Sequence, residues 1–169
     1  DNVFRLCVDG EAVSPVEIQV TGVLSTDGDI TYTGQSESTN QHIYSIEKGQ
    51  LSPQENNESL NSGVREGDLL VVAHSNFETT KTLYSLYNLN EPATPVSTFT
   101  NNAESPVVTP NVTVETTGKI NLTSAIIWPE NHVAGTKIPV ICAPYGGPHH
   151  ARVIASGLSF YSDQWLANQ

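Results

Sequence analysis

Hydrophobic and polar residues alternate with a period of two along much of the first hundred positions. Such alternation, rich in β-branched and aromatic residues and punctuated by Asp-Gly or Gly-Asp pairs, is typical of antiparallel strands. It predicts strands at residues 3–8, 18–24, 30–34, 42–46, 69–74 and 82–87. The segment 49–63 is polar and poor in strand formers, so we expect a surface loop there. The short spacing between strands favours a β-sandwich or the blades of a β-propeller.

The pattern changes after residue 100. A linker-like stretch is marked by prolines, which cannot donate to a central ladder: Pro92, Pro95, Pro106 and Pro110. Residues 111–115 and 120–128 predict a hairpin with a glycine-bearing turn. The nearly continuous apolar run 138–145 predicts a strand buried on both faces, as in α/β sheets. Apolar residues then recur at helical spacing and predict a helix: Leu158, Tyr161, Trp165 and Leu166. We expect the two aromatic residues, Tyr161 and Trp165, to lie in the core.

Charge and cysteine content narrow the classes of function. The 169 residues carry a net charge of −11, which argues against binding nucleic acid or an anionic membrane through a basic patch. Cys7 and Cys142 lie in apolar stretches without metal-ligand spacing, so we expect two buried free thiols. No disulfide, metal or other cofactor is expected, and a cytoplasmic location fits free thiols.

The C-terminal part has the opening order of an α/β domain, namely a strand, a glycine-rich turn and a helix. A doubly buried strand needs neighbours on both edges, and an uncovered one would be prone to self-association. The chain also contains no Met. We therefore expect it to be a fragment of a longer protein, with the rest of this domain beyond Gln169.

A resemblance emerges at the end of the apolar run. Residues 138–153, which contain Tyr-Gly-Gly-Pro-His-His, and residues 161–169 resemble the prolyl oligopeptidase family of serine peptidases, nearest to its bacterial dipeptidyl-peptidase IV-type members. The segments 40–46 and 73–77 resemble that family's last propeller blades. The resemblance implies that residues 1–100 are the last blades of a β-propeller. Residues 101–169 would be a linker and the N-terminal part of the α/β-hydrolase catalytic domain, truncated before the nucleophile.

The residues needed for acyl transfer are only partly present. A nucleophile in Gly-x-Ser-x-Gly is missing, because Ser156 and Ser159 flank Gly157 at the wrong spacing. In this fold the acid and the histidine follow the serine, so the chain alone is expected to be inactive. By resemblance, Tyr145 donates its hydroxyl to the oxyanion, and the loop that follows contacts peptide substrate: Gly146, Gly147, Pro148, His149 and His150.

The remaining polar residues near the motif have simpler interpretations. Adjacent histidines point in different directions and lack a nearby carboxylate in sequence, so His149 and His150 are expected to form a hydrogen-bonded loop pair and not a metal site. Arg152 is expected to order the loop by pairing with an acid.

Two alternatives to a fragment of a dipeptidyl aminopeptidase-like serine peptidase stay open. One is a stand-alone β-rich binding domain that carries a similar loop. The other is a fragment of an acylaminoacyl peptidase or an esterase with the same architecture. The helical spacing that still runs at Gln169 favours the fragment over the stand-alone domain.

Overall fold

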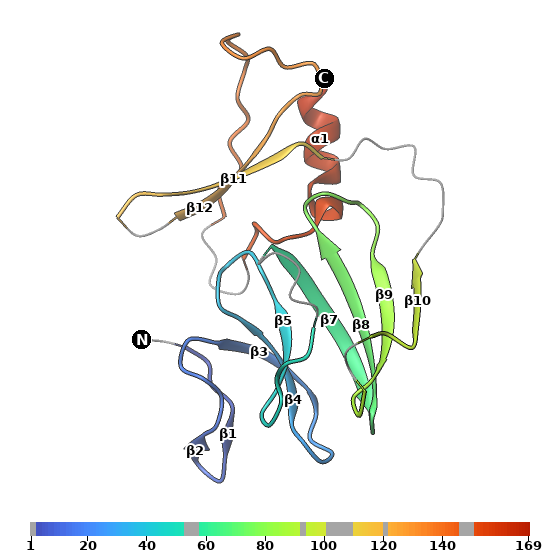
Figure 1. Cartoon of the computed structure of the whole chain (residues 1–169). Coiled ribbons are helices and arrows are strands. Elements are labelled where there is room, and N and C mark those ends of the chain that lie inside the picture. The colour runs from blue at the N-terminus through green and yellow to red at the C-terminus, as the bar shows by residue number, and fades with distance from the viewer. Residues whose placement is uncertain (1–2, 53–57, 92–93, 101–109, 120–121, 146–150) are drawn as a thin grey trace.

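The computed structural model describes residues 3–52, 58–91, 94–100, 110–119, 122–145 and 151–169. Within these residues the chain forms twelve strands in four antiparallel sheets, followed by one short α-helix (Figure 1). Two of the sheets have four strands and the other two are small hairpins. The prediction of an antiparallel β-rich chain that ends in a helix is confirmed at this level.

The first large sheet has the order β3-β4-β5-β6, so each strand pairs with its neighbour in sequence. Its strands confirm three predicted ones and add a short fourth: β3 (Gln19–Ser25), β4 (Thr31–Gln35), β5 (His42–Ser45) and β6 (Gly49–Gln50). A small hairpin of β1 (Cys7–Val8) and β2 (Glu11–Ala12) precedes it. The predicted strand 3–8 therefore forms only at its last two residues. Asp9 and Gly10 both have positive φ angles and turn the chain there.

The second large sheet has the order β10-β9-β8-β7. Its strands are β7 (Ser59–Glu66), β8 (Leu69–Asn76), β9 (Leu83–Asn88) and β10 (Ser97–Thr100). The predicted loop over 49–63 is wrong, since β6 lies at its start and β7 begins within it. The inward positions of β7 are polar, and hydrogen bonds with the neighbouring sheet satisfy them. The sequence of β7 therefore lacks the alternation of apolar residues from which a strand is predicted.

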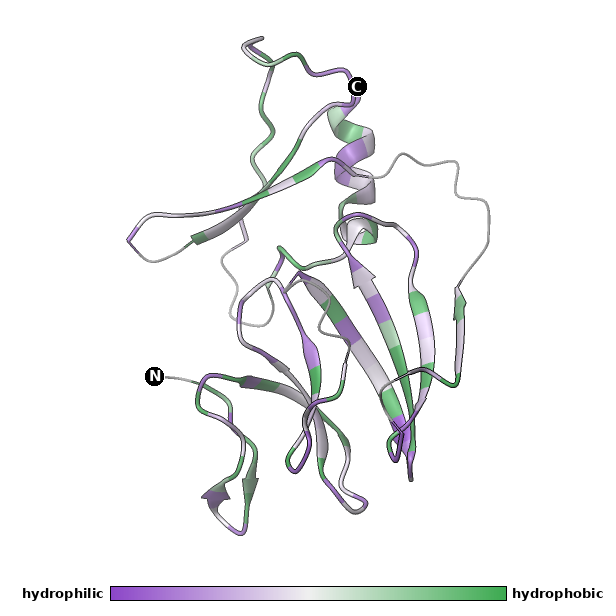
Figure 2. Ribbon diagram, in the orientation of Figure 1, coloured by the Kyte–Doolittle hydropathy of each residue, from purple (hydrophilic) through white to green (hydrophobic). Residues whose placement is uncertain are grey.

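The two large sheets pack against each other through an apolar cluster. Its buried members are Ile43, Leu70, Val72, Tyr87 and Leu89. Figure 2 shows hydrophobic stretches along the strands of both sheets. Close approach depends on Gly63 in β7, where a Cβ atom would lie 2.4 Å from the Val71 carbonyl oxygen and 2.9 Å from Ile43 Cδ1. A hydrogen bond between the sheets adds to this packing, because Arg65 Nη1 on β7 donates to Thr31 Oγ1 on β4 at 2.6 Å.

The described residues from 110 to 169 are called the C-terminal lobe. This lobe contains the predicted hairpin, formed by β11 (Val112–Thr117) and β12 (Leu122–Ile127), and the predicted helix. The helix begins with a 3-10 turn, η1 (Gly157–Phe160), and continues as α1 (Tyr161–Ala167). Gln164, 1% exposed, joins helix to hairpin. Its Oε1 accepts from the Asn111 backbone N–H at 2.7 Å, and its Nε2 donates to the Trp128 carbonyl at 2.9 Å.

The lobe also contacts the second large sheet. Gly157 lies so close to the chain after β8 that a Cβ atom would be 2.5 Å from the Thr79 carbonyl oxygen. The Phe77 and Phe160 rings contact each other with centroids 6.0 Å apart. Figure 1 shows α1 next to the β11–β12 hairpin, above the end of the two large sheets.

Three predictions about the C-terminal lobe are wrong. Residues 138–145 form no strand and are exposed, with Val140 at 86%. Cys142 in this segment is exposed, as is Cys7, so neither thiol is buried. In α1 the apolar face is open, with Trp165 at 64% exposure, and the buried side chain is Gln164. An apolar run becomes a buried strand only beside other strands, and no strand of the described residues pairs with this segment.

Candidate functional site

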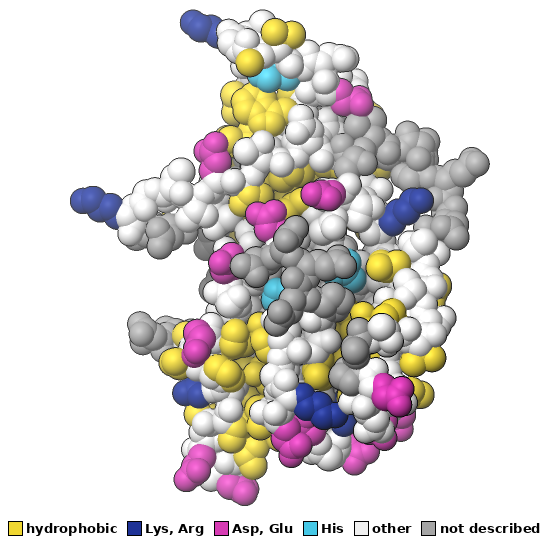
Figure 3. All heavy atoms as spheres, in the orientation of Figure 1, with side chains coloured by type: hydrophobic (Ala, Val, Ile, Leu, Met, Phe, Trp, Pro, Cys, Tyr) yellow, Lys and Arg dark blue, Asp and Glu magenta, His cyan; other side chains and the backbone are white. Residues whose placement is uncertain are grey.

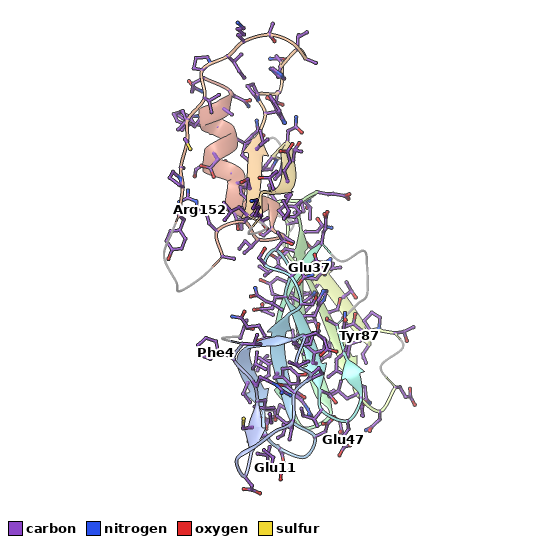
Figure 4. All side chains as sticks on the ribbon, turned by 90° about the vertical axis from the view of Figure 1, so that its left-hand side faces the viewer. Phe4, Glu11, Glu37, Glu47, Tyr87 and Arg152 are labelled. Atoms are coloured by element: carbon purple, nitrogen blue, oxygen red, sulfur yellow. The ribbon has the colours of Figure 1, made fainter. Side chains whose placement is uncertain are left out.

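The residue assigned by resemblance to the oxyanion hole ends the exposed segment 138–145. The Tyr145 side chain is 42% exposed, so its position is open to solvent. The loop residues expected to contact substrate, Gly146, Gly147, Pro148, His149 and His150, lie outside the described residues. Arg152 is exposed, at the junction between the helical lobe and the sheets (Figure 4). Its pairing with an acid stays a prediction.

The described serines near this segment do not form a nucleophilic site. Ser156 is buried, and its backbone carbonyl accepts from the backbone N–H of Ser159 at 3.0 Å. Neither the Ser156 nor the Ser159 hydroxyl has a histidine partner among the described residues. Acyl transfer needs a base in hydrogen-bond reach of the nucleophile.

A polar network that the sequence did not single out is buried where the two large sheets meet. Its centre is Asn61 on β7, whose side-chain Oδ1 accepts from His74 Nδ1 at 2.9 Å. Asn61 Nδ2 lies 3.2 Å from His42 Nδ1 on β5. Figure 3 shows histidine side chains toward the end of the two sheets that is nearer the C-terminal lobe. The network therefore links three strands, β5, β7 and β8.

The hydrogen bonds around His42 favour an unprotonated Nδ1 on its ring. Asn61 Nδ2 also points to the Gln41 carbonyl oxygen at 3.1 Å, and a carbonyl can only accept, so the amide orientation is determined. Asn61 Nδ2 also lies 3.0 Å from Ser59 Oγ, so its two hydrogens are shared among three acceptors, one of which is an unprotonated His42 Nδ1. The Asn61 Oδ1 acceptor in turn faces His74 Nδ1 as a donor. Two further polar atoms, Gln50 Nε2 and Ser52 Oγ, each lie 3.3 Å from His42 Nδ1. His42 is thus held as a neutral imidazole with an unprotonated Nδ1.

Burial supports the same protonation state. His42 is 5% exposed, and burial lowers its pKa below the ordinary value of 6.5 because a charged imidazole loses its hydration there. The nearby His74 lowers that pKa further. The missed signal in the sequence was a polar residue next to the apolar Ile43 in β5, a strand whose residues are all buried. The network serves the packing of the sheets. Its Ser52 hydroxyl is buried and already accepts from the Ile43 backbone N–H at 3.2 Å, and none of its described members is a carboxylate that could orient an imidazole.

A shallow pocket of about 440 Å³ lies in the C-terminal lobe, at the end of β12. The rings of Trp128 and His132 stack at one wall, with centroids 4.6 Å apart and an angle of 23° between their planes. The pocket is lined by Asn111, Trp128, Pro129, Glu130, His132, Ala134 and Gly135. Figure 3 shows hydrophobic and histidine side chains next to each other on this lobe. The sequence analysis did not identify this pocket, because its residues come together only when residues 129–135 fold back on β12.

Comparisons with known proteins add no assignment. No protein-family model matches the chain, and no curated protein matches it either. Among the described residues, no group of three or more His, Cys, Asp or Glu side chains is placed to hold a metal ion. No helix in the described part of the chain is long and apolar enough to cross a membrane.

Proposed function

We propose that this chain is part of a serine peptidase of the prolyl oligopeptidase type, made of the last two propeller blades and the start of the hydrolase domain. The observation that carries the proposal is the pair of four-stranded antiparallel sheets, each with strands in sequence order and packed face to face. Propeller blades are sheets of this kind. The hairpin β11–β12, the apolar segment 138–145 and α1 then follow in the order expected from the resemblance.

The outer face of the second sheet supports the propeller assignment. Strand pairing places apolar side chains together on the face turned away from the first sheet: Val64, Val71, Ala73, Tyr84, Leu86 and Phe99. Tyr84 and Phe99 stack with ring centroids 5.3 Å apart, and Phe99 is still 56% exposed. Contiguous exposed apolar surface marks a place where another element packs. A further blade would cover this face as the first sheet covers the opposite one.

The exposed segment 138–145 supports the hydrolase assignment. A run as apolar as Ile138, Val140 and Ile141 is unfavourable in water unless other strands cover it. In a completed α/β sheet it would become a central strand, and Tyr145 would lie at the end of that strand, where ligands bind in such sheets. The Tyr145 hydroxyl would then donate to the oxyanion that develops when the nucleophile attacks the substrate carbonyl.

The chemistry of the complete site divides between this chain and residues that it does not contain. The tyrosine hydroxyl stabilises negative charge, while the serine, the acid and the histidine would come from elsewhere in the enzyme. Peptides are the proposed substrates, and a cytoplasmic location remains part of the proposal. The exposed apolar segment also favours self-association of the isolated chain.

The reading frame downstream of Gln169 tests the proposal directly. A continuing frame with Gly-x-Ser-x-Gly followed by Asp and His would support it. A stop codon immediately after Gln169 would overturn it in favour of a stand-alone β-rich domain. The same proposal requires that the purified 169-residue chain does not hydrolyse an aminoacyl-prolyl chromogenic peptide. Turnover by this chain would contradict it.

A further inference from the structure

The pocket beside Trp128 has the composition of a site for a positively charged organic group. Its lining residues include Trp128 and the acidic Glu130 but no Lys or Arg. Aromatic faces attract organic cations through the ring quadrupole, most strongly in the case of tryptophan. A carboxylate next to such a face adds direct charge attraction.

Hydrogen bonds hold the walls of this pocket in place. The Trp128 backbone N–H donates to the Asn111 carbonyl at 3.1 Å, and the Trp128 carbonyl accepts from Gln164. The Glu130 backbone N–H donates to Asn168 Oδ1 at 3.0 Å, and Glu130 Oε2 accepts from Asn168 Nδ2 at 3.1 Å. The carboxylate is therefore positioned by the end of α1. Little ordering is needed on binding, which favours affinity.

One wall also contains an unsatisfied atom. His132 Nδ1 is buried and has no hydrogen-bond partner among the described residues. A buried polar atom without a partner is unfavourable, so its presence beside a cavity needs an explanation. When Nδ1 carries the lone pair, it adds negative potential behind the pocket. A cation in the pocket stabilises that tautomer.

We propose that the pocket formed by Trp128, Glu130 and His132 binds a small organic ammonium ion. Its volume of about 440 Å³ lies within the usual range of small-ligand clefts, roughly 300–1,000 Å³. The net charge of −11 on the chain favours the approach of cations over anions. The proposal goes beyond the peptidase assignment and does not depend on it.

Tryptophan fluorescence provides the test, because the chain has two tryptophans and Trp165 can be removed without touching the pocket. In Trp165→Phe, Trp128 is the remaining tryptophan. We expect tetramethylammonium chloride to change its emission in a saturable manner, relative to sodium chloride at equal concentration. The uncharged probe of similar size, tert-butyl alcohol, should not produce this saturable change.

Variants at two carboxylates test the charge contribution. When Glu130→Gln is added to the Trp165→Phe variant, tetramethylammonium binding should weaken by about threefold to fivefold, as for a partly exposed charge pair. The matched control is Glu115→Gln on the same hairpin, which removes an exposed carboxylate outside the pocket and should leave binding unchanged. Far-UV circular dichroism verifies that each variant is folded.

Three results would overturn the proposal. These are no saturable change in the folded protein, an equal response to tert-butyl alcohol, or equal binding by the Glu130→Gln and Glu115→Gln variants. The second result would identify an apolar pocket without charge selectivity. None of these measurements involves peptide hydrolysis, so their failure is distinguishable from failure of the peptidase proposal.

Discussion

Acidification should weaken the packing of the two large sheets through His42. The unfolded chain takes up a proton on this imidazole near its ordinary pKa of 6.5, whereas burial and His74 lower the pKa in the folded protein. Between these two pKa values the unfolded state binds one more proton than the folded state. The stability associated with neutral His42 is thus fully present above about pH 6.5 and falls as the pH decreases toward the folded-state pKa.

The magnitude follows from this difference of one proton. Within that pH window the free energy of unfolding should fall with a slope of at most about 1.4 kcal/mol per pH unit, which is the value for a difference of one whole proton. The structural reason is direct, because a proton on Nδ1 would face Asn61 Nδ2 at 3.2 Å and Gln50 Nε2 at 3.3 Å. Both atoms are donors, so the protonated ring would lose its hydrogen bonds at this nitrogen.

Urea unfolding between about pH 5 and about pH 8 measures the effect. The wild-type chain is compared with His42→Gln, which removes the titrating group and keeps a polar side chain. Carboxylates titrate in both proteins, so the difference between their slopes isolates His42. Gln169→Ala is the matched control, since Gln169 is exposed, lies outside this network and has no titrating side chain. Its slope should equal that of the wild type.

Equal slopes in wild-type protein and His42→Gln would refute this reasoning. If the glutamine variant does not fold, an NMR titration of His42 in the wild-type chain replaces the comparison. A pKa at or above 6.5 for this imidazole in the folded protein would likewise show that the network does not hold it neutral.

Three further changes test other parts of the structure. Gln164→Ala should lower the free energy of unfolding by about 3 kcal/mol in urea titrations, because it leaves the Asn111 N–H and the Trp128 carbonyl without their hydrogen-bond partner. The control Gln169→Ala, at an exposed position, should have little effect. Gly157→Ala should destabilise by about 1–3 kcal/mol in thermal unfolding, since its Cβ would meet the Thr79 carbonyl oxygen at 2.5 Å. In the complete peptidase that we propose, Tyr145→Phe should lower kcat about 100-fold with little change in KM, and an unchanged kcat would remove Tyr145 from the proposed oxyanion hole.

Local pattern was sufficient to predict most of the strands. The predicted strands 30–34 and 69–74 correspond to β4 and β8, although β4 is buried on both faces and β8 carries apolar residues on its partly exposed face as well as on its buried one. The hairpin at Gly118 followed from its turn residue, which has a positive φ angle. Pattern failed at β7, where Ser59 and Asn61 are buried by hydrogen bonds and not by hydrophobicity.

The candidate sites also differ in whether a local sequence pattern could predict them. Tyr145 was identified by a motif, and a motif is a property of neighbouring residues. The His42–Asn61–His74 network joins segments that are distant in sequence, so no local pattern contains it. The Trp128 pocket is lined mostly by residues between 128 and 135, and it forms only when this stretch folds together beside Asn111. Their chemistry depends on distances near 3 Å, which arise only after the strands pair.

The amino-acid sequence by itself determined the β-rich class, the hairpin, the helix and the net negative charge, because period, turn chemistry and composition are local or additive properties. Tertiary structure alone decided which residues are buried. It placed Gln164 in the interior of the lobe and left Trp165 and the apolar run 138–145 exposed. The physical reason is that hydrophobic residues become buried only where another surface covers them, while a polar residue is buried where partners satisfy its hydrogen bonds.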